Sequence, residues 1–117
     1  MADKMIVYYK SKKIIIKNLR KLSNLGKITG LMFRSKSAFN LLFNFDKNTN
    51  MPIHSFFVFY DFLAIWTDEN NNAVDFKIVR PFTSIIKSKR PFRKLIELPI
   101  NESNKAIIKF FVGKGKV

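Results

Sequence analysis

The sequence predicts an α+β fold that is mainly β, a small curved antiparallel sheet or partly closed barrel with about two short helices. Short runs rich in β-branched and aromatic residues recur along the chain and are separated by polar, turn-forming residues. The chain has 117 residues with no internal repeat and no linker, so we expect a single domain over 1–117. No apolar run approaches the roughly twenty residues that a membrane-spanning helix requires.

The first strands are expected to form a hairpin. The runs "MIVYY" (5–9) and "KIIIK" (13–17) are β-branched or aromatic, and "KSK" separates them. Residues 22–34 are ambiguous, because Ser23 can cap a short helix while two glycines in the segment argue against a long one. Further along, "LLFNF" (41–45) is expected to be a strand and "DKNTNMP" (46–52) a loop.

The aromatic stretch from residue 53 to residue 67 is predicted to be two strands rather than a helix. Aromatic and β-branched residues favour strands, and Tyr60-Asp61 provides a break between the halves 53–59 and 62–67. Both faces of this stretch are apolar, so we expect it to lie centrally in the sheet. "DENNN" (68–72) then forms a turn, because Asn and Asp tolerate left-handed backbone conformations.

The C-terminal part is expected to contain two more strands and a helix. A return strand lies in the stretch 73–82 and ends before Pro81, and another strand covers 94–100. Between them, 83–94 is predicted to be a basic loop. Asn101 is a candidate N-cap for a short helix over 101–111, with an acidic residue in its first turn.

The charge is strongly positive and unevenly spread. The formal net charge is +14, made up of +9 over residues 1–36, −4 over 37–76 and +9 over 77–117. A/T-rich codons would explain the preference for Lys over Arg, but they do not explain why Glu is scarce. The positive charge is therefore unbalanced within the chain, which makes an anionic partner such as nucleic acid a reasonable expectation.

Several kinds of chemistry are absent from the sequence. There is no cysteine, which excludes disulfides, thiolate nucleophiles and cysteine-bound metals. There is one histidine, His54, and no phosphate-binding loop. We therefore expect no catalytic residues, no metal site and no cofactor, and an enzyme is the least favoured class. The apolar run at 5–9 is too short for a signal-peptide core, so a cytoplasmic location is expected.

The basic loop is the best functional lead in the sequence. Phosphate-binding cations and one aromatic residue, Phe92, lie within it, and Phe92 either stacks on a base or packs into the core. The candidate anion-binding residues of this segment are Lys87, Lys89, Arg90, Arg93 and Lys94. The alternative is a small-molecule or carbohydrate pocket lined by His54, Trp66 and Arg80. A third possibility is a protein-interaction module whose charge maintains solubility.

Several motifs in order resemble one family. They are "GLMFR" (30–34), "LLFNF" (41–45), "IHSFFVFYDFLAIWTD" (53–68), "LIELP" (95–99) and Val112-Gly113. The chain resembles the domain-of-unknown-function family 192 in its shorter archaeal form. This resemblance implies a compact β-rich domain without an established activity, and it makes Arg34 a counterpart of the family's arginine. Arg34 then either anchors an anion or fixes a loop through backbone carbonyls.

The chain departs from that family at two acidic positions. The family has an aspartate where this chain has Leu63, and it ends in Val-Gly-Asp where this chain has Lys114 after Val112 and Gly113. An acid-dependent activity shared with the family is therefore not expected.

Overall fold

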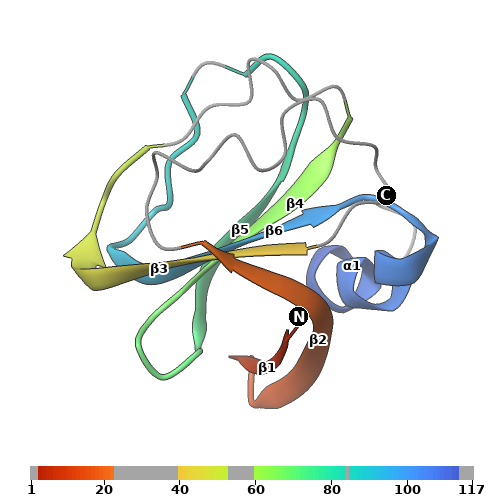
Figure 1. The fold of residues 1–117 in the computed structure, drawn as a ribbon, viewed down its shortest axis with the longest axis horizontal. Coiled ribbons are helices and arrows are strands. Elements are labelled where there is room, and N and C mark those ends of the chain that lie inside the picture. Colours follow the sequence, from red (N-terminus) through yellow and green to blue (C-terminus); the bar gives the residue numbers. More distant parts are fainter. Residues whose placement is uncertain (1–2, 23–39, 53–59, 84, 114–117) are drawn as a thin grey trace.

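The computed structural model describes residues 3–22, 40–52, 60–83 and 85–113. These residues form one six-stranded sheet followed by a short helical segment (Figure 1). The elements are β1 (Asp3–Tyr9), β2 (Lys12–Leu22), β3 (Asn40–Thr49), β4 (Phe62–Thr67), β5 (Ala73–Val79), β6 (Phe92–Pro99), the 3-10 turn η2 (Glu102–Asn104) and α1 (Lys105–Val112).

The sheet is mixed rather than purely antiparallel. The strand order is β1-β2-β3-β6-β4-β5, and β2 pairs in parallel with β3 while all other pairs are antiparallel. The prediction of an antiparallel sheet is therefore wrong for this one pair. A parallel pair needs a crossover connection of about a dozen residues or more, and residues 23–39 join these two strands outside the described part of the chain.

The sheet curls so far that its two edge strands meet at one point. The Tyr8 N–H donates to the Asn71 carbonyl at 2.9 Å, and Tyr8 forms an isolated bridge with Asn72 at the start of β5. The result is a half-barrel whose edges touch at one end only, as Figure 1 shows. This agrees with the mainly β, curved sheet that the sequence predicted.

The predicted β1–β2 hairpin is confirmed, and its turn explains how it closes. Lys10 and Ser11 have φ values of 50° and 62°, as the two central residues of a type I′ turn require. Asn18 also has a positive φ (58°), next to a register shift between the strands. Asn tolerates this conformation better than most residues, and the extra residue in β2 is typical of a bulge that increases curvature.

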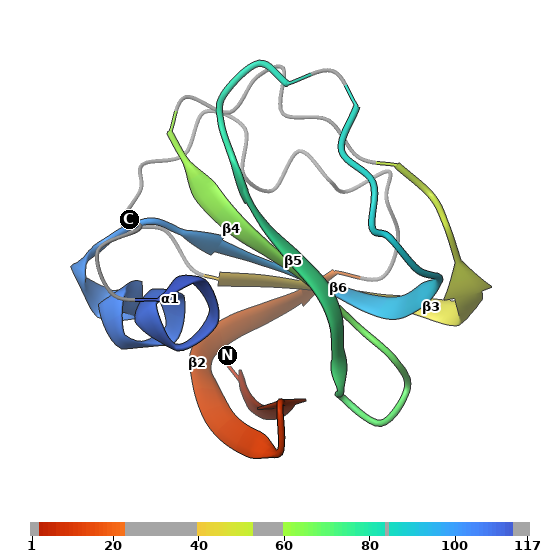
Figure 2. The same ribbon diagram turned by 180° about the vertical axis from the view of Figure 1, so that it is seen from behind.

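Two apolar clusters lie on opposite faces of the sheet. The inner cluster draws side chains from all six strands, and α1 covers it with Ile107, Ile108 and Phe111 (Figure 2). The outer cluster lies on β3, β4, β5 and β6, and it includes Ile86 from the loop after β5. β4 contributes alternate residues to both clusters and is buried along its whole length. Its predicted central place in the sheet is therefore confirmed, whereas residues 53–59 lie outside the described part.

The described residues contain one helical segment, over 102–112, where the sequence predicted about two short helices. Its predicted cap is confirmed, because the Asn101 side chain accepts the Asn104 N–H at 3.0 Å. Gly113, with φ of 96°, ends α1. The other candidate helix, over 22–34, falls outside the described residues.

A reciprocal pair of buried amides fastens the helical segment to the sheet. Asn104 Nδ2 donates to Asn40 Oδ1 at 2.9 Å and to the Pro99 carbonyl at 2.8 Å. Asn40 Nδ2 donates to Asn104 Oδ1 at 3.2 Å and to the Lys17 carbonyl at 2.8 Å. Both side chains are almost fully buried, so each depends on the other for its hydrogen bonds.

Candidate anion-binding site

The basic segment predicted from the sequence divides into two parts in the structure. The loop ends at Pro91, and β6 begins at Phe92, so the predicted loop over 83–94 is too long by three residues. Lys87, Lys89 and Arg90 are exposed in the loop. Asp75 Oδ2 accepts the Lys89 N–H at 2.9 Å, which ties the loop backbone to β5 while leaving its side chains at the surface.

Arg93 and Lys94 lie on β6 and contact neighbouring protein groups. Arg93 donates from Nε to the Phe45 carbonyl at 2.7 Å and lies 3.5 Å from the Glu69 carboxylate through Nη1. Lys94 Nζ donates to Asn71 Oδ1 at 2.6 Å. These two cations stabilise the turn between β4 and β5, so they are less available to an external anion than the three exposed loop cations.

The aromatic residues proposed as ligand contacts are in the core. Trp66 and Phe92 are buried in the outer cluster, so neither offers a ring to a ligand at the surface. Lys77 Nζ lies 5.9 Å from the centroid of the Trp66 ring, and the Trp66 indole N–H is buried without a partner. The hypothesis that Phe92 stacks on a base is therefore wrong, and the alternative that it packs into the core is correct.

The predicted small-molecule pocket is not assembled from the residues that can be placed. Arg80 lies 3.5 Å from Asp61 in a surface ion pair, away from the buried Trp66. His54 and Arg34 lie outside the described residues. Within the described residues, no group of three metal-ligating side chains comes together. No helix in those residues has the length and hydropathy needed to span a bilayer.

Glu97 is the one strongly perturbed carboxyl among the described residues. It lies on β6 between Leu41 and Ala64 of the adjacent strands and is 3% exposed. Burial raises the pKa of Glu97 to about 8. This carboxyl is thus neutral at pH 7 and belongs to the outer core rather than to a surface site.

The basic loop packs on the outer face of the sheet, opposite α1, whereas the basic hairpin is part of the sheet itself. Side chains of β1 and β2 pack in the inner cluster with α1, whereas Ile86 anchors the loop in the outer cluster. Figures 1 and 2 show the loop and α1 on opposite sides of the sheet. Lys10 and Lys12 at the hairpin turn therefore lie beside α1, whereas Lys13, which pairs with Tyr8, faces the convex side of the sheet.

The hairpin carries the denser positive charge. Residues 4–21 include seven Lys or Arg and no acid, and all seven side chains are exposed: Lys4, Lys10, Lys12, Lys13, Lys17, Arg20 and Lys21. The ion pairs between described residues do not include Lys10, Lys12 or Lys17. No carboxylate of a described residue therefore lies within 4.0 Å of these three lysines.

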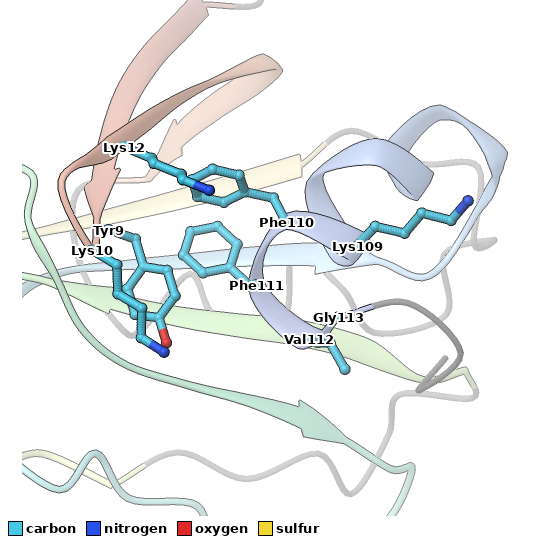
Figure 3. A pocket seen from close by; sticks show the side chains of 8 residues that line it. All are labelled: Tyr9, Lys10, Lys12, Lys109, Phe110, Phe111, Val112 and Gly113. Atoms are coloured by element: carbon cyan, nitrogen blue, oxygen red, sulfur yellow. The ribbon is translucent and has the colours of Figure 1, made fainter.

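A pocket of about 390 Å³ lies where the hairpin turn meets the end of α1; we call it the tip pocket (Figure 3). Its aromatic residues pack together, since the Tyr9 centroid lies 5.4 Å from that of Phe111 and 6.3 Å from that of Phe110. The cations Lys10, Lys12 and Lys109 border it, and its described lining residues include no acid. Lys10 Nζ lies 5.3 Å from the Tyr9 centroid, whereas Lys109 extends away from the rings in Figure 3.

This site could not be predicted from the sequence, because its parts are about a hundred residues apart. The hairpin turn supplies Lys10 and Lys12, and α1 supplies Lys109 and Phe110. One signal was present in the sequence, namely the seven Lys and Arg residues between positions 4 and 21, but this density does not show that Lys109 or Phe110 lies beside them.

The fold and this site define a small, mainly β half-barrel domain with a basic hairpin. No family model matches the chain, and no curated protein matches it. It is similar to the structure of a "putative transcription regulator" from Sinorhizobium meliloti 1021, with 14% identity and a TM-score of 0.71 over 92% of this chain and 86% of that one. It is also similar to a protein of unknown function from Novosphingobium aromaticivorans DSM 12444, with 12% identity and a TM-score of 0.64 over 89% and 76% of the two chains. At these identities the similarity establishes the fold alone.

Proposed function

We propose that the protein is a non-catalytic module that binds an anionic ligand, with nucleic acid as the ligand class best matched to its charge. The observation that carries this proposal is the tip pocket, where three lysines border a cluster of aromatic rings and the described lining residues include no carboxylate. Lysines that neutralise phosphates gain affinity by releasing condensed counterions, and this gain does not depend on base sequence.

Two exposed clusters compete for this role. The tip cluster consists of Lys10, Lys12 and Lys109, and the loop cluster consists of Lys87, Lys89 and Arg90. We assign the main contacts to the tip cluster, because the rest of the hairpin adds further positive charge beside it. The similarity to the "putative transcription regulator" from S. meliloti is compatible with a nucleic-acid ligand, although it concerns the fold.

A small anionic molecule with an aromatic ring is the second candidate. The tip pocket has a volume within the range of about 300–1,000 Å³ that small-molecule sites occupy. Such a ligand would place its ring against Phe110 and its charged group near Lys10 or Lys12. This binding would saturate with a mononucleotide, whereas polymer binding requires several phosphates.

The experiment compares two variants with the same net charge. One replaces Lys10, Lys12 and Lys109 with Ser, and the other replaces Lys87, Lys89 and Arg90 with Ser. Fluorescence anisotropy with mixed-sequence duplex DNA, single-stranded DNA and RNA is measured across a salt series. About four to six phosphate contacts give the wild type a log–log salt slope of about −4 to −5 on duplex DNA.

The tip variant is expected to lower the magnitude of that slope by up to about 3, and the loop variant to change it by less than about 1. Both variants should fold, because exposed charges usually change stability by less than about 0.5 kcal/mol each. If the loop variant changed the salt slope more than the tip variant, the main phosphate contacts would belong to the loop cluster. Wild-type binding weaker than about 100 μM at 50 mM salt would remove nucleic acid as the ligand, and a mononucleotide titration would then test the pocket.

A further inference from the structure

The convex face of the β1–β2 hairpin carries an apolar patch that is separate from the tip pocket. Ile6, Tyr8 and Ile15 are 36%, 42% and 47% exposed. Ile6 pairs with Ile15 across the two strands, and Tyr8 pairs with Lys13, so the three apolar side chains are neighbours on one face. Their companions Met5 and Val7 point to the inner cluster, as the alternation of a strand requires.

Within the part of the chain that the structure describes, this patch lies beside the outer edge of β1, which meets β5 only at the Tyr8–Asn72 bridge. In the sheet, β1 pairs with β2 alone, and the Tyr8 N–H points away from β2 to reach the Asn71 carbonyl. Backbone groups in a strand alternate in direction, so the N–H and C=O of Ile6 point to the same outer edge. Among the described residues, no backbone bond outside the β1–β2 ladder reaches Ile6. An exposed strand edge of this kind is a template for another strand.

A groove of about 480 Å³ runs along that edge. It is lined by Lys4, Met5, Ile6, Tyr8, Ile15 and Asn71. Asn71 belongs to the turn between β4 and β5, so the groove lies where the two edges of the half-barrel separate. We call it the edge groove. It offers both backbone hydrogen-bonding groups and apolar side chains to an extended segment.

The positive charge around the edge groove favours an occupant that carries carboxylates. Lys4, Lys13 and Lys17 are exposed on the two strands that form this face. The Asp68 carboxylate in the neighbouring turn is already bonded by Asn70 and Asn72. A second copy of this chain would bring the same lysines to the contact, and like charges oppose that pairing. An occupant with carboxylates is instead attracted.

We infer that the edge groove binds an acidic β-strand of another protein, which adds to the edge of β1. Its backbone pairs with Ile6, one apolar side chain packs between Ile6 and Ile15, and a carboxylate lies near Lys4. This mode of recognition takes affinity from main-chain hydrogen bonds and specificity from alternate side chains. The surface is independent of the tip pocket and does not require that the protein binds nucleic acid.

The probe is a short synthetic peptide, acetyl-Gly-Glu-Val-Ile-Val-Glu-Gly-amide. Its pattern reads the same in both directions, so it suits parallel or antiparallel addition. Titration into 15N-labelled protein is expected to shift the amides of residues 4–8 and Asn71, with a Kd on the order of 100 μM at low salt. The same peptide with Lys in place of Glu should bind at least about tenfold more weakly.

Two methylated peptides test the strand pairing directly. One carries N-methyl groups on both valines, and the other carries them on the isoleucine and the second glutamate. Only alternate amides of an added strand face β1. Therefore one methylated peptide should lose at least about tenfold in affinity while the other keeps most of it. Equal binding by both peptides, or amide shifts away from the groove, would overturn the inference.

Matched apolar variants locate the contact. Ile15→Ser should weaken peptide binding at least about fivefold, because it removes the apolar contact across from Ile6. Ile85→Ser changes another exposed isoleucine, in the basic loop, and should leave binding unchanged. The tip variant should also bind the peptide. If anionic phosphatidylglycerol vesicles shift the same amides and the peptide does not, the face is a lipid surface and the inference fails.

Discussion

Replacing Glu97 with Gln should stabilise the protein relative to the wild type, and this difference should grow as the pH rises. The folded state buries this carboxyl between Leu41 and Ala64, and burial raises its pKa from 4.5 to about 8. Gln has nearly the same shape and no charge at any pH. The substitution therefore removes the cost of keeping a proton on Glu97 while retaining most of the packing.

The direction of the effect follows from proton linkage. Below pH 4.5, Glu97 is protonated in both the folded and the unfolded chain, and its full contribution to stability is present. Between pH 4.5 and about 8, the unfolded chain releases the proton and the folded chain retains it. The free energy of unfolding of the wild type then falls by about 1.4 kcal/mol per pH unit from this group alone. Above about pH 8 the loss is complete.

The expected magnitude is large for a chain of this size. The pKa difference between about 8 and 4.5 corresponds to a total of at most about 5 kcal/mol. Domains of this kind have a total stability of about 5–15 kcal/mol. Between pH 5.0 and 7.5, the stability of the Gln variant minus that of the wild type should increase by about 3 kcal/mol.

Urea unfolding followed by circular dichroism at half-unit steps from pH 5.0 to 8.5 measures this difference. Glu102→Gln is the matched control, because Glu102 is exposed and forms only a surface ion pair with Lys105. Its difference from the wild type should stay within about 0.5 kcal/mol at every pH. If the stability of Glu97→Gln minus that of the wild type also stayed constant with pH, the reasoning would be refuted. The buried carboxyl would then titrate as it does in the unfolded chain.

Two further stability predictions concern the amide pair and the hairpin turn. Asn104→Ala should cost about 2–4 kcal/mol in urea unfolding, because it removes the side-chain donor to the buried Asn40 Oδ1 and to the Pro99 carbonyl; a cost below about 1 kcal/mol would contradict a stabilising role for this amide pair. Ser11→Gly should raise stability by about 0.5–1 kcal/mol, because Ser11 has a φ of 62° that glycine adopts without strain. A fall in melting temperature for Ser11→Gly would show that the positive φ of Ser11 does not reduce the stability of the wild type.

The sequence alone predicted the features that depend on near neighbours. The hairpin of 5–9 with 13–17, the strand character of 62–67 and the Asn101 cap follow from residues within a few positions of one another. Their signals are the preference of β-branched and aromatic side chains for strands and the ability of an Asn side chain to accept a helix-terminal N–H. The predicted mainly β curved sheet rests on such local signals, and the structure agrees with it.

Features that depend on distant pairings were decided by the tertiary structure. The order of the strands and the parallel pairing of β2 with β3 follow from how the whole sheet buries its apolar residues, and no local pattern encodes them. The same packing buries Trp66, which was predicted to line a pocket, and Phe92, for which the sequence left a surface and a core position open.

The candidate site shows this division most clearly. The sequence located positive charge at both ends of the chain, but charge density carries no information about which segments share a face. The fold places Lys10 and Lys12 of the hairpin beside Lys109 and Phe110 of α1, and it packs the basic loop on the opposite face of the sheet from α1. It also turns Glu97 into the core, because the alternation of β6 directs residue 97 to the same face as Leu95.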